Sequence, residues 1–160
     1  MGRALGYAWR PFFNHVMPVL PKNYDWHPDY SVGIPALDAQ HKRLLQLCQR
    51  ISSCTIHPIP EGYDVLHYIL RDMANYAEEH FRSEEQVLRD MHFPDLEKHL
   101  AEHRVYEAKL SEFLASLSAH HHEPEQLAKF LGSWWVGHIL HSDMDYAAYY
   151  KSAAPCVSGS

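Results

Sequence analysis

The stretch HFRSEEQVLRDMHFPDLEKHLAEH, which runs from His80 to His103, decides how this chain folds. His80 and Glu84 stand four residues apart, and so do His99 and His103. Residues four apart share one face of an α-helix, so each pair could grip a metal ion from one side. Pro94 lies between the pairs and is expected to end the first helix and begin the second. The stretch therefore predicts a helical hairpin that presents two metal-ligand side chains from each arm.

Composition limits the classes of protein to consider. The chain has 160 residues, of which 46% are hydrophobic, and this is enough for one domain with a real core. The net charge of −6 and the lack of a lysine or arginine cluster argue against nucleic acid as a partner. A total of 14 histidines is a large excess that hints at metal or proton chemistry. The odd set of cysteines, without zinc-type spacing, favours a reducing compartment and a fold without disulfides: Cys48, Cys54 and Cys156.

Residues 1–24 do not fit a targeting segment. A signal peptide needs an unbroken apolar run, and here Arg10, Pro11, Pro18 and other residues interrupt it. No stretch approaches the roughly 20 apolar residues of a membrane-spanning helix. We therefore expect a cytoplasmic protein without stable membrane insertion. Its predicted parts are an N-terminal extension over 1–24 that docks on a domain over 25–150, and a flexible tail over 151–160.

Apolar residues recur at helical spacing in four segments of the chain. The predicted helices run from about 35 or 38 to 53, from 63 to 91, from 94 to 118 and from 124 to 149. The inward positions of the first are spaced as in the seam of a bundle: Leu37, His41, Leu44, Cys48 and Ile51. No segment shows strand-like alternation. Four amphipathic helices with short loops predict an all-α, up-down-up-down antiparallel four-helix bundle with an N-terminal arm.

Residues that could bind metal fall on or beside the inward stripes: His41, His80, Glu84, His99, His103 and His138. An unpartnered buried carboxylate costs several kcal/mol and an unpartnered core imidazole roughly 1–3 kcal/mol. These side chains must satisfy one another or hold metal, and metal explains all of them at once. Asp143 follows His138 by five residues, about 140° around an ideal helix. It needs either a local π-bulge or a sideways reach, and by period alone His141 and Asp145 compete with it.

The order of these residues resembles the hemerythrin family in its single-domain bacterial form. That order is His41, then His80-x3-Glu84, His99-x3-His103 and His138-x4-Asp143. Four other stretches look like the family too: Trp26…Tyr30-Ser-Val-Gly-Ile34, Asp38-x2-His41, HFRSEE at 80–85, and Trp134-x3-His138-Ile139. The resemblance covers about residues 25–150, and all seven ligand positions hold the family's residue types.

The resemblance implies a non-haem di-iron centre with a bridging oxo or hydroxo group. By similarity, one iron is held by His99, His103 and His138, the other by His41 and His80, and both are bridged by Glu84 and Asp143. Imidazole and carboxylate ligands suit iron. In this assignment the iron with three histidines is six-coordinate. The iron with two histidines has five ligands and keeps an open position.

Reversible dioxygen binding, for carriage, storage or delivery, is the function that the resemblance implies, rather than catalysis. Dioxygen would be held as hydroperoxide on the five-coordinate iron, in a dry pocket that is lined by similarity by Leu44, Phe81, Trp134 and Ile139. We expect a monomer, with an oxygen-consuming enzyme as a fitting partner. The alternatives are a di-iron enzyme (peroxidase or NO-reducing) and a sensor of O2, NO or redox state that use the same site. Weak peroxidase-type activity is compatible with the main hypothesis.

Some other residues compete for attention. Tyr76 and Tyr106 lie on inner stripes, and we expect each to pack with its hydroxyl turned away from the centre. Donation of a proton or electron by either would instead favour enzyme chemistry. The tract His120-His121-His122 is expected to be a solvated loop rather than a second metal site. The sequence contains no Glu-x-x-His, the motif of ferritin-like di-iron proteins, and no His-Glu-x-x-His protease motif.

Overall fold

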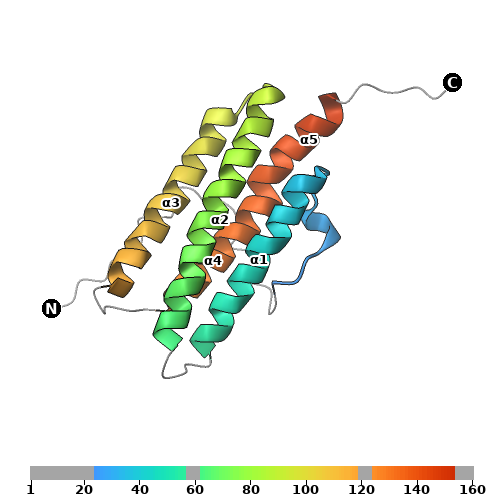
Figure 1. The fold of residues 1–160 in the computed structure, drawn as a ribbon. Coiled ribbons are helices and arrows are strands. Elements are labelled where there is room, and N and C mark those ends of the chain that lie inside the picture. Colours follow the sequence, from blue (N-terminus) through green and yellow to red (C-terminus); the bar gives the residue numbers. More distant parts are fainter. Residues whose placement is uncertain (1–23, 57–61, 119–123, 154–160) are drawn as a thin grey trace.

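Helices make up nearly all of the computed structural model, which describes residues 24–56, 62–118 and 124–153. A short 3-10 helix is followed by five α-helices, with a π-helix between the last two (Figure 1). Their bounds are η1 (Pro28–Tyr30), α1 (Pro35–Ile56), α2 (Gly62–Asp90), α3 (Leu96–Ser118), α4 (Pro124–His138), η2 (Ile139–Asp143) and α5 (Met144–Ala153). The expected extension up to residue 23, the His120-His121-His122 loop and the tail beyond Ala153 lie outside the described residues.

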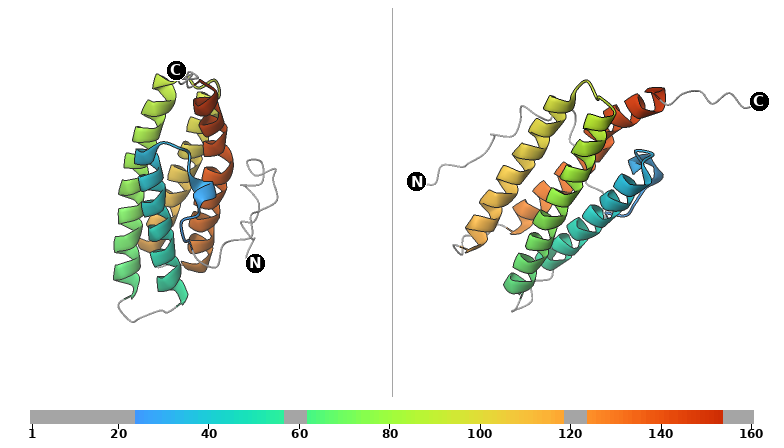
Figure 2. Two further views of the ribbon diagram at one scale, coloured as in Figure 1. Left: turned by 90° about the vertical axis from the view of Figure 1, so that its right-hand side faces the viewer. Right: turned by 45° about the horizontal axis from the view of Figure 1, so that its top comes forward.

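The last three elements run end to end and serve as the fourth helix of a bundle. α1 packs against α2 and against α4, and α2 packs against α3. The two views of Figure 2 show α1, α2, α3 and the α4–η2–α5 rod lying lengthwise beside one another. The predicted all-α bundle is confirmed, and no strand occurs in the part of the chain that the structure describes. None of the described helices is long and apolar enough to span a membrane.

The turn between α2 and α3 differs from the expected break at Pro94. α2 ends at Asp90, and His92 takes a left-handed backbone conformation with φ of 55°. The backbone N–H of Phe93 then donates to the carbonyl of Leu88, a bond that closes the end of the helix. The chain has therefore already turned before Pro94, and α3 begins only at Leu96.

The other helix ends lie within a few residues of the prediction. α1 begins at Pro35 and continues to Ile56, three residues beyond the expected end. α5 continues to Ala153, beyond the expected end near Tyr149, so part of the predicted tail is helical. The arm before α1 is not wholly extended, because η1 forms a single 3-10 turn.

Two apolar clusters fill the bundle, with a polar layer between them. The larger cluster includes Leu44, Phe81, Tyr106, Trp135 and Ile139. The smaller cluster consists of Val32, Leu37, Leu88, Phe93, Tyr146 and Ala147. Along the chain, the predicted metal ligands of each helix lie between a residue of one cluster and a residue of the other. The order of the clusters reverses from each helix to the next, as an antiparallel bundle requires.

The N-terminal arm is fixed to the bundle at two points. The side chain of Asp38 in α1 accepts hydrogen bonds from the Ser31 hydroxyl and the Val32 backbone N–H. At the other end of the arm, the backbone N–H of Tyr24 donates to the side chain of Gln49. The ring of Tyr24 is buried, and burial raises the pKa of its hydroxyl to about 12. These contacts hold the described part of the arm, from Tyr24 onward, against the bundle, and docking of the residues before Tyr24 stays a prediction.

Candidate metal centre

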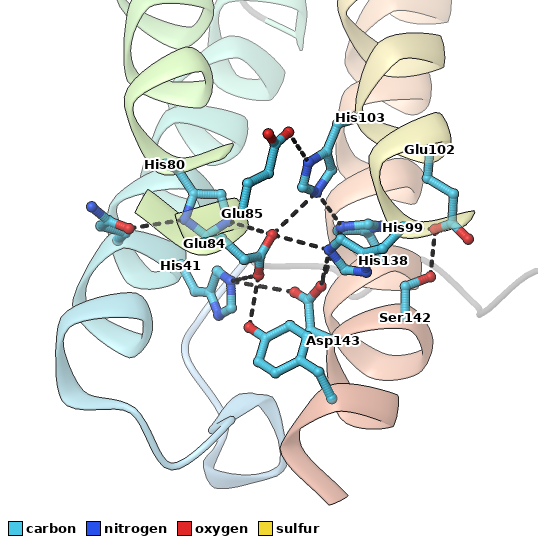
Figure 3. A network of polar contacts seen from close by, with 12 residues as sticks. His41, His80, Glu84, Glu85, His99, Glu102, His103, His138, Ser142 and Asp143 are labelled. Atoms are coloured by element: carbon cyan, nitrogen blue, oxygen red, sulfur yellow. Dashed lines mark hydrogen bonds and ion pairs between the residues drawn. The ribbon is translucent and has the colours of Figure 1, made fainter. Parts of the chain in front are cut away.

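Seven side chains of metal-binding types lie together in the polar layer, and every helix of the bundle contributes at least one of them (Figure 3). They are His41 of α1, His80 and Glu84 of α2, His99 and His103 of α3, His138 at the end of α4 and Asp143 at the end of η2. None of these residues is more than 3% exposed. The structure thus brings together all seven residues predicted from the sequence.

The π-helix η2 explains how Asp143 reaches the centre. A π-helix bonds residues five apart, so its turn is one residue wider than an α-helical turn. His138 and Asp143, five residues apart, therefore face the same way, and the His138 Nε2 and Asp143 Oδ1 atoms lie 3.2 Å apart. His141 and Asp145, the competing candidates by helical period, are exposed. Of the two explanations left open by the sequence, the π-bulge is the one that the structure contains.

The ligand atoms form two overlapping groups, each of which could hold one metal ion. One group contains Glu84, His99, His103 and His138, and the other contains His41, His80 and Glu84. Asp143 contacts both groups, since its Oδ1 lies 3.2 Å from His138 Nε2 and its Oδ2 lies 3.3 Å from His41 Nε2. Two carboxylates are therefore shared between two sets of imidazoles.

Distances in the first group match the spacing of ligands around one ion. Glu84 Oε2 lies 3.1 Å from the Nε2 atoms of both His99 and His103. The Nε2 atoms of His103 and His138 are also 3.1 Å apart. Neighbouring ligands that each bind a metal at about 2.1 Å lie about 3 Å from one another. The ligand atoms of this group are therefore already at the spacing that a bound metal ion requires.

The outer nitrogen of a candidate ligand histidine is its Nδ1 atom, which points away from the centre. In two histidines the partner of this atom indicates where the ring hydrogen lies. His103 Nδ1 lies 3.1 Å from Glu85 Oε1, and His138 Nδ1 lies 3.0 Å from Glu102 Oε2. An ionised carboxylate can only accept, so each Nδ1 carries the hydrogen, and in the neutral form of each ring Nε2 then keeps a lone pair. Two such lone pairs 3.1 Å apart would repel each other, and a cation between them would remove the repulsion. This arrangement fits a metal site better than a hydrogen-bonded core.

Glu102 is ionised in this arrangement. Burial opposes its ionisation, but hydrogen bonds from His138 and Ser142 outweigh burial and lower the pKa of the carboxyl to about 2. It can therefore accept from both donors at neutral pH.

Several buried polar atoms at the centre have no hydrogen-bond partner within the described residues. They are both ring nitrogens of His41, Nε2 of His80 and both carboxylate oxygens of Asp143. Each such atom costs roughly 1–3 kcal/mol when it is left unsatisfied in the interior. These side chains are the usual ligands of transition metals, so a bound metal would satisfy them. The residues present therefore fit the expected metal pair.

Burial sets the charge of these groups. It lowers the pKa of His41 and of His80, and it lowers the pKa of His138 to about 3. These rings are neutral at pH 7, which is the form that binds metal. Burial, with the nearby carboxylates of Glu84 and Glu102, raises the pKa of Asp143 well above its ordinary value. The protonated form of Asp143 is therefore favoured in the metal-free protein, and a metal ion would replace that proton.

The structure adds residues that the sequence prediction missed. The Tyr146 hydroxyl donates to Glu84 Oε1 at 2.7 Å, and His80 Nδ1 lies 3.0 Å from Gln40 Oε1. Tyr146 follows Asp143 by three residues, so the helical period could have found it. Gln40, Glu85 and Glu102 each stand next to a predicted ligand in the sequence, but the period places them off the inward stripe.

The four residues predicted to line an oxygen pocket are all buried: Leu44, Phe81, Trp134 and Ile139. Two of them lie flat on candidate ligands. Phe81 stacks on His103 with ring centroids 3.9 Å apart, and Trp134 stacks on His138 with centroids 4.2 Å apart. Leu44 and Ile139 belong to the larger apolar cluster on the same side of the centre. Their role in binding oxygen stays a prediction.

Trp135 was not predicted but lies beside the centre. Its ring centroid is 5.5 Å from that of His80, and its Nε1–H donates to the Tyr106 hydroxyl at 3.0 Å. The Tyr106 hydroxyl is therefore engaged with an indole rather than with a candidate ligand, as expected for a packing role. Tyr76 is half-buried and lines a surface hollow of about 230 Å³ with residues that include Arg43.

Comparisons with known proteins agree with the site. The family model described as "Hemerythrin HHE cation binding domain" matches residues 32–150. A bacteriohemerythrin of Stenotrophomonas maltophilia is 22% identical over 129 residues, which cover 79% of this chain and 81% of that protein. A bacteriohemerythrin of Clostridium acetobutylicum is 24% identical over 124 residues, covering 76% and 96%. A myohemerythrin of Theromyzon tessulatum is 25% identical over 127 residues, covering 79% and 93%.

Proposed function

This chain belongs to the hemerythrin family, and from that premise we propose that it binds dioxygen reversibly at a pair of iron ions without catalysing a reaction. One observation carries the proposal: seven buried ligand side chains form two overlapping groups that share carboxylates. One iron would be held by His99, His103 and His138, the other by His41 and His80, and both by Glu84 and Asp143. Two ferrous ions there would supply the electrons and the open coordination position that reversible dioxygen binding requires.

The protein's own part is first to hold the ligands in place. Gln40, Glu85 and Glu102 accept hydrogen bonds from the outer nitrogens of three ligand histidines. Such partners fix the orientation and the tautomer of each ring, so that Nε2 faces the metal. The Tyr146 hydroxyl similarly fixes one oxygen of Glu84.

The second part is to keep water and protons away from bound oxygen. The rings of Phe81 and Trp134 cover two ligand histidines with apolar surface. The Trp135 indole N–H donates to the Tyr106 hydroxyl, so it is not free to donate toward the centre. A dry wall of this kind favours release of intact dioxygen over oxidation of the iron, which supports a carrier rather than an enzyme.

The first test is the visible absorption spectrum of the iron-loaded, anaerobically reduced protein. An absorption band should appear in air and fade under argon over repeated cycles. Direct passage to a stable oxidised spectrum without that band would contradict reversible binding and favour a di-iron enzyme or a redox sensor.

Two alanine variants test the ligand assignment. His103→Ala should lose iron or the reversible band, because His103 is a proposed ligand. His67→Ala is the matched control, since His67 is exposed on α2, and it should behave like the unaltered protein. Equal behaviour of the two variants would overturn the assignment. The expected cytoplasmic location, monomeric state and oxygen-consuming partner enzyme stay predictions from the sequence.

A further inference from the structure

The outer nitrogens of the candidate ligands have chemically different partners. Three ligand rings have a hydrogen-bond acceptor at Nδ1: His103 with Glu85, His138 with Glu102, and His80 with Gln40. The three contacts have nearly the same length, between 3.0 and 3.1 Å. They differ in charge, because two of the acceptors are carboxylates and the third is a neutral amide.

Both carboxylates contact histidines of the same ligand group. His103 and His138 lie in the group with three histidines, whereas His80, which has the amide partner, lies in the group with two. A carboxylate that accepts from Nδ1–H pushes electron density into the ring and makes Nε2 a stronger donor to a cation. An amide does this less. The three-histidine position therefore has more ligands and also more basic ones.

The two-histidine position also lacks a carboxylate partner at its other histidine. The Nδ1 atom of His41 is buried and has no hydrogen-bond partner within the described residues. Glu84 is also unequal, because its Oε2 lies 3.1 Å from His99 and His103. Its contacts with the two-histidine group are longer, at 3.8 Å from Oε2 to His80 and 3.9 Å from Oε1 to His41. The Tyr146 hydroxyl donates to Oε1, and this bond withdraws electron density from the oxygen that contacts His41.

These differences all act in one direction. We propose that the two metal positions are unequal in affinity and fill in order, the three-histidine position first, and that Glu85 and Glu102 act as positioning residues that set this order. The inference rests on the two-metal centre of the proposed function but not on dioxygen binding. It goes further by assigning roles to Glu85, Glu102 and Gln40.

The test is a titration of the metal-free full chain with Co²⁺ under anaerobic conditions, read by visible absorption with a competing chelator. His120, His121 and His122 are replaced by alanine in every protein, so that the histidine tract does not bind the probe. Two steps should be resolved, the first tighter than the second. His41→Ala identifies the steps, because it should remove the second and leave the first.

Variants of the outer partners then separate positioning from general structure. Glu102→Gln keeps the side-chain shape and should weaken the first step by about tenfold or more while changing the second much less. Gln40→Glu should tighten metal binding in the second step and so reduce the difference in affinity between the two steps. Glu97→Gln is the matched control, because it removes the same charge from an exposed site on α3 and should change neither step appreciably.

Several outcomes would overturn the inference. If the two ions bind with the same dissociation constant, the inference is wrong, although the two-metal centre of the proposed function still stands. A loss in Glu102→Gln that falls equally on both steps, or that matches Glu97→Gln, would also overturn the inference. Binding of fewer than two ions would overturn both this inference and the proposed function. If Glu102→Gln does not fold, as judged by far-UV circular dichroism, Glu85→Gln tests the same claim at His103.

Discussion

The aromatic ring of Tyr24 lies directly against the backbone of Gly132, so that the N-terminal arm contacts the middle of α4. A Cβ atom on Gly132 would overlap the hydroxyl and two ring carbons of Tyr24. Because the backbone N–H of Tyr24 also donates to Gln49 of α1, this residue ties the arm to two helices. One of those helices ends at His138, so the arm supports the element that carries a candidate ligand.

Gly132→Ala should lower the free energy of unfolding by about 1–3 kcal/mol, the usual cost of overpacking. In a Tyr24→Ala background the overlap is gone, and the same substitution should stabilise the protein, because alanine favours a helix by about 1 kcal/mol over glycine. Urea denaturation of the four proteins gives the coupling between the two sites. An identical effect of Gly132→Ala in both backgrounds would contradict the contact.

His92→Gly should stabilise the protein by about 1 kcal/mol, because a left-handed backbone costs a side-chain-bearing residue about that much and costs glycine little. His92→Ala is the comparison, since it keeps the unfavourable φ and loses the contact between Nδ1 and the carbonyl of Arg89. Thermal unfolding should rank glycine above histidine and histidine above alanine. An alanine variant as stable as the glycine variant would show that φ is not what limits this turn.

Asp143→Asn should change how the stability of the metal-free protein depends on pH. The pKa of Asp143 is raised above its ordinary value of 3.8, so the folded protein keeps a proton that the unfolded chain loses. The stability linked to that proton is fully present below pH 3.8 and is lost as pH rises toward the raised pKa. Asparagine is always neutral. In the presence of a chelator, the melting temperature of the unaltered protein should therefore fall relative to Asp143→Asn as the pH rises above about 4. A constant difference would contradict the raised pKa.

Tyr106→Phe should destabilise the protein by about 1–3 kcal/mol, because it leaves the buried Trp135 N–H without its acceptor. It should also shorten the lifetime of the reversible absorption band, since the indole N–H beside His80 becomes free to donate. Tyr76→Phe is the control, because Tyr76 lines a surface hollow and not the centre. If both variants lose the band at the rate of the unaltered protein, the indole bond has no part in protecting bound oxygen.

The fold could be predicted from the sequence because every helix carries a long amphipathic stripe. The inward positions Leu37, His41, Leu44, Cys48 and Ile51 of the first helix are all buried, as their spacing indicates. Helix ends were less accurate, because they depend on local bonds. The α2–α3 turn is set by the left-handed His92 and the bond from Phe93 to Leu88, and Pro94 merely follows it.

The candidate site likewise contains residues that the sequence could predict and residues that it could not. Six of its side chains could be selected by helical period. Four of them form i,i+4 pairs, which have one geometry on any α-helix, and the other two, His41 and His138, continue the inward stripes of their helices. Asp143 could not, because its place depends on a π-helix that no local pattern signals, and only the family resemblance selected it. The outer partners Gln40, Glu85 and Glu102 point from the flank of each helix toward a neighbouring ring. Such contacts depend on the packing of two helices, which the period of one helix does not encode.

The π-helix also shows where the length of this chain can change. Its wider turn holds one more residue than an α-helical turn, so His138 and Asp143 stand five residues apart and still face the same way. Deleting one residue between them, such as His141, would leave them four apart, the spacing that shares a face on an ordinary α-helix. The rest of the rod would stay in phase, with Asp143 and Tyr146 still beside Glu84. The same deletion within α4 or α5 meets no wide turn and would rotate the residues on its two sides by about 100° relative to each other. This five-residue segment is therefore the part of the rod that can lose a residue without separating the candidate ligands.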